Sequence, residues 1–309
     1  MSIIKKRQHY VWRSYLRSWA DKKDHIWALK KDDNKILNPE LMGVAQEKYF
    51  YRVHELTEQE IDFMRRFINE KTPVVVRDFC LDLLENYIVP VKLKSFFTSK
   101  GIVDKDIEEK VRCVEINMFE DIHCLFEKFG EKILQCKSIK DLQSMGDEDW
   151  YAALIFMMFQ YMRTKNMRTS IVSGFKKDSV QWGILADKLW PLMSSIQAIT
   201  MGRNLSIDPT IKFKLLDNKT INHFLAADQP IINYVGDISD DEGYAKELEL
   251  YYPISPQIAL YIYFNTKQAK KFVVESLDEE QVEQYNRKMI ENSHMWIFSD
   301  TQEQLDSYL

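Results

Sequence analysis

Apolar residues recur with a helical period through the middle of the chain. After residue 56, Thr57 and Glu60 form a capping-box signature, and the apolar side chains that follow fall on one face. A second apolar stripe follows Thr72 and Pro73, which suit a helix start, and it is predicted to end at Pro90. Similar periodicity over 104–135, 148 into the 160s and 178–200 predicts a helical bundle over residues 56–203.

The period changes from about 3.6 to 2 after residue 209, which is typical of strands. Strands are predicted at 211–215, 223–226, 248–252, 258–264 and 272–275, with a terminal helix over 279–292. Near the N-terminus, an aromatic helix over 9–19 precedes a hairpin that turns at 32–34. The predicted fold is α+β: a helical middle with a C-terminal, mostly antiparallel sheet and an N-terminal helix plus hairpin.

No linker or composition shift divides the pattern. We therefore predict a single domain over residues 1–309, with the N-terminal helix and hairpin at 9–55, the bundle at 56–203, and the sheet and terminal helix at 208–309. The hydrophobic content is 45%, and 9 Gly and 8 Pro indicate a globular chain. The longest apolar run, residues 152–159, is too short to span a bilayer, so no membrane partner is expected. The basic start lacks the apolar run of a secretory signal, which predicts a cytoplasmic location.

Charge is distributed unevenly along the chain, although the net charge is only −5. Residues 1–31 carry nine Lys or Arg against two Asp, whereas residues 275–309 carry nine acids against two bases. Two interpretations stay open: the basic segment docks on the acidic one, or it binds the phosphates of a nucleic acid. The four Cys have no CxxC spacing, which disfavours a zinc knuckle.

Common catalytic signatures are missing, so the candidates are polar residues inside apolar segments. His9 lies beside the aromatic helix, and its imidazole suits general acid or base chemistry. Arg163 ends an apolar helix and Arg168 follows it; a guanidinium there serves phosphate binding, an internal ion pair or a helix cap. Asp228 interrupts an apolar strand. Its presence there is explained either by a turn with Pro230 or by a functional site at the end of the strand.

Four segments resemble a known family. HYVWRSYLRSW is similar to an HYxPxxYLxxF opening, FQYMRTKNMR to QxxRTxxxR, LAADQPI to TSDxPV, and YYPISPQIAL to PLSPxxAL. These motifs, in this order, are those of the domain-of-unknown-function family catalogued as number 4238. The chain departs from the pattern at Trp12, where Pro is usual, and at Ala227 and Gln229, where Ser and Asn are usual.

The resemblance carries a set of site positions onto this chain. They are His9, Tyr10, Tyr15, Gln160, Arg163, Arg168, Asp228, Pro230 and Ser255. Because Ala227 replaces a Ser of the pattern, a role for a hydroxyl before Asp228 is in doubt here. The name of the family assigns it no activity, so the resemblance fixes no reaction.

Two functions are carried forward. The first is a phosphodiesterase-like, RNase-like nuclease acting as an effector of a bacterial conflict or anti-phage system. In it His9 is the general acid or base, Arg163 and Arg168 stabilise phosphate charge, and Asp228 orients His9 or binds a divalent metal. The substrate-binding residues would be Tyr10, Tyr15, Gln160, Arg168 and Ser255, with the basic N-terminal segment holding nucleic acid. The alternative is a non-catalytic ligand- or partner-binding domain in which the same His, Arg and Asp pair with one another.

The two functions predict different surroundings for the same three residues. Both require His9, Arg163 and Asp228 to lie near each other. Convergence on an open cleft favours the site, whereas convergence in a closed core favours the structural network. The sequence leaves the substrate, the metal and the oligomeric state open.

Overall fold

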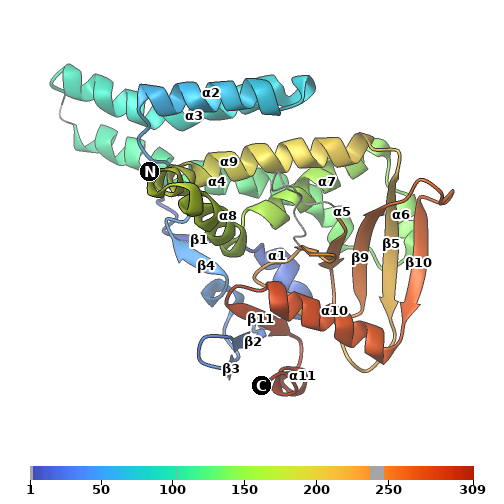
Figure 1. The fold of residues 1–309 in the computed structure, drawn as a ribbon. Coiled ribbons are helices and arrows are strands. Elements are labelled where there is room, and N and C mark those ends of the chain that lie inside the picture. The colour runs from blue at the N-terminus through green and yellow to red at the C-terminus, as the bar shows by residue number, and fades with distance from the viewer. Residues whose placement is uncertain (1–2, 103, 237–246) are drawn as a thin grey trace.

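A computed structural model describes residues 3–102, 104–236 and 247–309 (Figure 1). The N-terminal part holds short elements: β1 Arg7–His9, α1 Arg13–Leu16, η1 Arg17–Trp19, β2 Trp27–Lys30, β3 Lys35–Leu37, η2 Leu41–Gly43 and β4 Gln46–Lys48. The predicted hairpin is β2–β3, whose turn includes Asn34 at φ 49°. The predicted aromatic helix begins only at Arg13, because residues 7–9 form a strand paired with β4.

The helical middle is confirmed. Its elements are α2 Glu58–Lys71, α3 Val74–Ser99, α4 Lys105–Glu127, η3 Lys128–Gly130, α5 Glu131–Leu134, α6 Ile139–Gln143, α7 Asp147–Met162, α8 Lys165–Asp178 and α9 Val180–Ile207. Thr57 caps α2 in a full capping box with Glu60, as its sequence predicts. Helix α8, which begins at the Thr164 cap, has no counterpart among the predicted elements.

Two details of the predicted second helix are wrong. Thr72 does not begin α3; it ends α2, and its hydroxyl donates to the Ile68 carbonyl at 2.6 Å. Pro90 does not end α3, which continues through it to Ser99. A proline inside a helix removes one main-chain hydrogen bond, and here the packing of α3 against α4 and α9 outweighs that loss.

The C-terminal part holds the sheets. Its elements are β5 Ile211–Asn218, β6 Ala226–Ala227, β7 Ile232–Asn233, β8 Leu250–Pro253, β9 Ile258–Phe264, β10 Phe272–Leu277, α10 Glu279–Asn292, β11 Trp296–Ser299 and α11 Gln302–Asp306. One sheet has the order β10-β5-β9-β8-β7 and is antiparallel except for the parallel β10–β5 pair. A second sheet, β3-β2-β11-β6, joins the N-terminal hairpin to the C-terminal strand β11. The α+β class is therefore confirmed.

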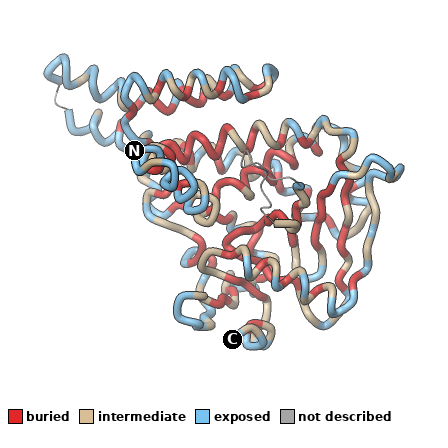
Figure 2. Tube along the Cα trace, in the orientation of Figure 1, coloured by how far each residue is buried: buried red, intermediate tan, exposed pale blue. Residues whose placement is uncertain are grey.

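The core lies where α7 and α9 cross beneath the sheets. Figure 2 shows buried positions concentrated in these two helices and in the inner strands. A Cβ at Gly202 of α9 would lie 2.7 Å from the Ile155 Cα of α7, so only glycine permits this close approach. One hydrophobic cluster contains Tyr10, Phe156 and Phe298 and so draws on all three parts of the chain. The single-domain organisation stays a prediction, which limited proteolysis tests.

The charged ends meet through the second sheet. Lys31 donates to the carbonyl oxygens of Ile290 and Ser293, both at 2.8 Å, at the C-terminal end of α10. The basic segment thus docks partly against helix carbonyls, which carry partial negative charge. None of the helices in the described ranges is long and apolar enough to cross a bilayer.

Candidate functional site

Strand β1 places His9 against the helical middle. The neighbouring Gln8 is fully buried; its amide donates to the Ile116 carbonyl at 2.6 Å and its Oε1 accepts from the Tyr51 N–H at 2.7 Å. The Tyr51 hydroxyl then donates to the Arg163 carbonyl at 3.2 Å, with the His9 carbonyl at 3.4 Å. The first two predicted residues, His9 and Arg163, therefore meet at one hydroxyl group.

The His9 side chain is half-buried and neutral at physiological pH. Burial lowers its pKa to about 4, and the positive charges of Arg13 and Arg163 act in the same direction. Among the described residues, its buried Nε2 has no hydrogen-bond partner. An imidazole with so low a pKa is a weak general base, because catalysis favours a pKa near the working pH.

Arg163 caps the C-terminal end of α7 and is only 1% exposed. Its Nη2 lies 2.8 Å from the Glu127 Oε1, which forms an ion pair in the protein interior. A buried guanidinium needs such a partner, because an unpaired charge in the core is costly. The predicted internal ion pair is therefore present, and its acid comes from the end of α4.

Polar side chains are gathered around Arg163, and its charge contributes to the pKa shifts of His9, Glu120, His123 and Tyr252. Burial raises the pKa of Glu120 to about 7, although Arg163 opposes the shift. Burial lowers the pKa of His123 well below its ordinary value, and Arg163 lowers it further. We call these residues, with Arg163 itself, the Arg163 cluster: His9, Tyr15, Glu120, His123, Gln160, Arg163 and Tyr252.

Each member of the Arg163 cluster has at least one buried side-chain atom without a partner among the described residues. Both ring nitrogens of His123 and both amide atoms of Gln160 belong to this set. Sequence reasoning missed Glu120, Glu127 and His123, because all three lie on the regular amphipathic pattern of α4 and carry no motif. Only the packing of α4 on α7 reveals that they face Arg163.

Asp228 lies between β6 and β7, is 1% exposed, and has both carboxylate oxygens occupied. They accept from the main-chain N–H groups of His294, Met295 and Trp296, at 2.8, 2.8 and 3.1 Å. Burial raises its pKa, and these three donors oppose the shift. Its carboxylate therefore holds the chain that enters β11, and its hydrogen bonds among the described residues go to this main chain and not to His9.

A second bridge connects Arg163 to Asp228 through their chain neighbours. The Thr164 hydroxyl hydrogen-bonds to the Gln229 side-chain oxygen, and the Gln229 amide donates to the Tyr161 carbonyl at 3.0 Å. The structure thus gathers the three predicted residues around the C-terminal end of α7. Arg163 and Asp228 lie in the closed core, where both are almost inaccessible, and His9 is half-buried at its edge.

The five residues predicted to bind substrate are also engaged or enclosed. Tyr10 is buried against Phe50, and Tyr15 is buried against Tyr252, with ring centroids 5.4 and 5.3 Å apart respectively. Gln160 is 1% exposed. Arg168 pairs with Asp187 at 2.9 Å and donates to the Phe50 carbonyl. The Ser255 hydroxyl accepts from the Ile258 N–H within the turn between β8 and β9.

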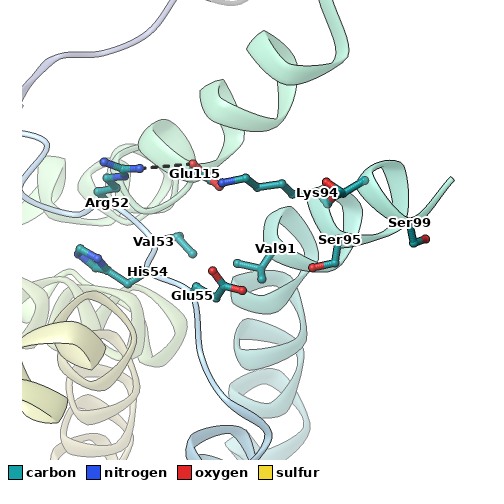
Figure 3. A pocket seen from close by; sticks show the side chains of 10 residues that line it. Arg52, Val53, His54, Glu55, Val91, Lys94, Ser95, Ser99 and Glu115 are labelled. Carbon is teal, nitrogen blue, oxygen red and sulfur yellow. Dashed lines mark hydrogen bonds and ion pairs between the residues drawn. The ribbon is translucent and has the colours of Figure 1, made fainter. Parts of the chain in front are cut away.

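An open cleft lies elsewhere, between residues 52–55, α3 and α4, and we call it the polar cleft (Figure 3). Its volume is about 470 Å³. Figure 3 shows Arg52 and Lys94 reaching toward Glu115 from opposite sides, and Arg52 lies 3.7 Å from the Glu115 carboxylate. Burial lowers the pKa of His54, and the charge of Arg52 contributes. None of His9, Arg163 and Asp228 lines this cleft.

The described residues contain no group of three or more His, Cys, Asp or Glu side chains that could hold a metal ion. Comparison with curated proteins and with solved structures finds no match. A family model described as "Protein of unknown function (DUF4238)" matches residues 7–186 and 197–303, which is most of the chain. The resemblance carried by the four sequence motifs is thereby confirmed, and the chain belongs to the DUF4238 family of proteins of unknown function.

Proposed function

We propose that this chain is a non-catalytic ligand-binding domain in which His9, Arg163 and Asp228 form a structural network. The observation that carries this proposal is the use of the Asp228 carboxylate by three main-chain N–H donors. The Nε2 of His9, which has no partner in the described part of the chain, belongs to an imidazole whose pKa is lowered to about 4, so it is a weak general base. The ion pair of Arg163 with Glu127 in the core supports the same reading.

The polar cleft is the ligand site that we propose. Arg52 and Lys94 enter it from two separate elements, and the hydroxyls of Ser95, Thr98 and Ser99 line the same side of α3. Its volume lies within the range of about 300–1,000 Å³ that small-molecule sites occupy. Two cations beside hydroxyl groups suit a ligand with a carboxylate or phosphate group. Glu115 pairs with Arg52 at 3.7 Å, and Glu55 also lines the cleft, so Lys94 is the cation that we expect to contact the ligand charge.

Calorimetric titration with inorganic phosphate and with succinate tests the cleft. Lys94→Glu is expected to abolish binding of both anions, because it places a carboxylate where the ligand charge would lie. Lys100→Glu, at the exposed end of α3 and outside the cleft, is the matched control and should bind like the wild type. Equal binding by the two variants would remove the polar cleft from the proposal.

The nuclease hypothesis competes with this proposal and is tested on His9. His9→Ala should lower the free energy of unfolding by about 1–3 kcal/mol, because it removes packing and a polar contact at the edge of the core. RNA and single-stranded DNA, incubated with Mg²⁺ or Mn²⁺, should stay intact with both proteins. Cleavage by the wild type that His9→Ala abolishes without a change in melting temperature would favour the nuclease instead.

A further inference from the structure

Helix α3 is apolar on two sides, yet only one side is covered. Cys80 and Leu84 are fully buried, whereas Val75 and Phe79 are 68% and 48% exposed. A helix that is apolar all round is normally enclosed by the protein. The outer face of α3 therefore presents apolar surface that calls for an occupant.

The exposed face of α3 forms one wall of a groove of about 930 Å³. Helix α4 forms the opposite wall, and Ile155 of α7 and Ile199 of α9 lie at its base. Lys128 is the only charged residue that lines it in the described part of the chain. We call this the apolar groove. It is separate from the polar cleft, because no residue lines both.

The apolar groove has a length and a direction. Fourteen positions separate Val75 from Val89 on α3, and fourteen separate Val114 from Lys128 along α4 and its end. At 1.5 Å per residue, each wall is about 21 Å long. A short turn joins the two helices, so they run antiparallel; Lys128 and Val75 lie at one end, and Val89 and Val114 at the other.

We propose that the apolar groove binds the hydrocarbon chain of one long-chain fatty acid, with its carboxylate at Lys128. One lipid chain spans about 15 Å, half of a bilayer's apolar core, so the groove accepts a single extended chain. The exposed Lys128 has no ion-pair partner among the described residues and supplies one positive charge for one carboxylate.

Chain length is the first test, with saturated fatty acids titrated calorimetrically below their critical micelle concentrations. Each added methylene should tighten binding by about three- to fourfold while it still contacts the groove. The gain should stop when the chain exceeds the groove, and the stoichiometry should be one to one. Affinity that is independent of chain length, or binding seen only above the micelle concentration, would overturn the proposal.

Substitutions at the two ends of the apolar groove test the binding of the carboxylate and the binding of the hydrocarbon chain separately. Lys128→Glu should weaken binding of the fatty acid about fivefold, and should leave the matching fatty alcohol unaffected. Lys110→Glu, exposed on the same helix and outside the groove, is the matched control. Val114→Trp, at a position 44% exposed, should shorten the groove and make the affinity gain stop at a shorter chain.

Two results would contradict the assignment. If the fatty alcohol binds the wild type as tightly as the acid does, Lys128 does not hold the head group. If light scattering shows a dimer that Phe79→Asp converts to a monomer, a second copy covers the groove instead. Circular dichroism melts of all variants verify that they fold, and neither outcome bears on the polar cleft or on His9.

Discussion

The Arg163 cluster and the α3–α4 pair are opposites in composition and in exposure. The cluster gathers ionisable and polar side chains in the closed interior, whereas α3 and α4 leave apolar side chains at the surface. Each arrangement reverses the usual rule that apolar groups lie inside and charges outside. Under the function that we propose, the polar residues singled out by motif stabilise the fold, and ligands bind where no motif points.

The largest expected effect is on the Asp228 anchor. Asp228→Ala removes the buried acceptor of three main-chain N–H groups and should lower the free energy of unfolding by about 5 kcal/mol. Urea unfolding measures it. Asp121→Ala, which breaks an exposed ion pair with Lys5, should cost less than about 1 kcal/mol. A loss at Asp228 as small as the loss at Asp121 would break the comparison between core and surface.

The Arg163–Glu127 pair should give the next largest effect. Arg163→Met leaves Glu127 without its partner and should destabilise the protein by about 3 kcal/mol. Adding Glu127→Gln should restore part of this loss, because the remaining side chain is no longer charged. The double-mutant cycle is measured by thermal and urea unfolding. Additive losses would show that the two groups do not interact.

The pH dependence of stability tests whether Glu120 belongs to the closed core. Its folded pKa of about 7 lies above the ordinary value of 4.5, so the folded state binds the extra proton. The stability that this proton confers is present below pH 4.5 and is lost as the pH rises through 7. Glu120→Gln should therefore raise the free energy of unfolding by about 2 kcal/mol at pH 8 and change it little at pH 4.5.

Burial shifts the pKa of His9 in the opposite direction, so His9 is the control for that experiment. Its folded pKa of about 4 lies below the ordinary 6.5, so the unfolded chain binds the proton more readily. Protonation therefore destabilises the folded state as the pH falls from 6.5 toward 4. His9→Ala should flatten the acid side of the stability profile and lower the alkaline side by a constant amount, because the lost packing does not depend on pH. A Glu120→Gln profile parallel to that of the wild type would place Glu120 in solvent.

The smallest expected effect concerns nucleic acid. Lys5, Arg17 and Lys31 of the basic segment already have partners within the chain, which leaves fewer cations for phosphates. We expect only weak association with single-stranded RNA, measured by fluorescence anisotropy and lost as salt is raised. Substituting Lys22 and Lys23 by Glu should reduce the salt slope by about 0.7 per lost phosphate contact. Binding that is insensitive to salt would contradict this prediction.

Helix caps and the periods of helices and strands could be predicted from the sequence, because they depend on neighbouring residues. Thr57 with Glu60 is an example, and the strand over residues 258–264 is another. The continuation of α3 past Pro90 could not, since it depends on packing against other helices. Strand β11 was missed because its four residues make sense only beside β2 and β6.

The candidate site was also predictable only in part. That His9, Arg163 and Asp228 would find partners follows from the cost of burying polar groups alone. Which partners they find does not: Glu127 arrives from α4, and the main chain at 294–296 reaches Asp228 across about 66 residues. The polar cleft had no sequence signal, because its lining comes from three segments that are each unremarkable in sequence.

The pairing of β2 with β11 has a consequence for how the chain is made. Trp27 and Ser299 are neighbours in one sheet, although about 270 residues lie between them. At about 5–20 residues per second, a ribosome needs roughly 15–50 s to add that stretch. During this interval the β2–β3 hairpin has an unpaired edge, which is a template for joining other chains. The interval of greatest risk of aggregation is thus set by the speed of translation, and slower synthesis of the sheet region would prolong it.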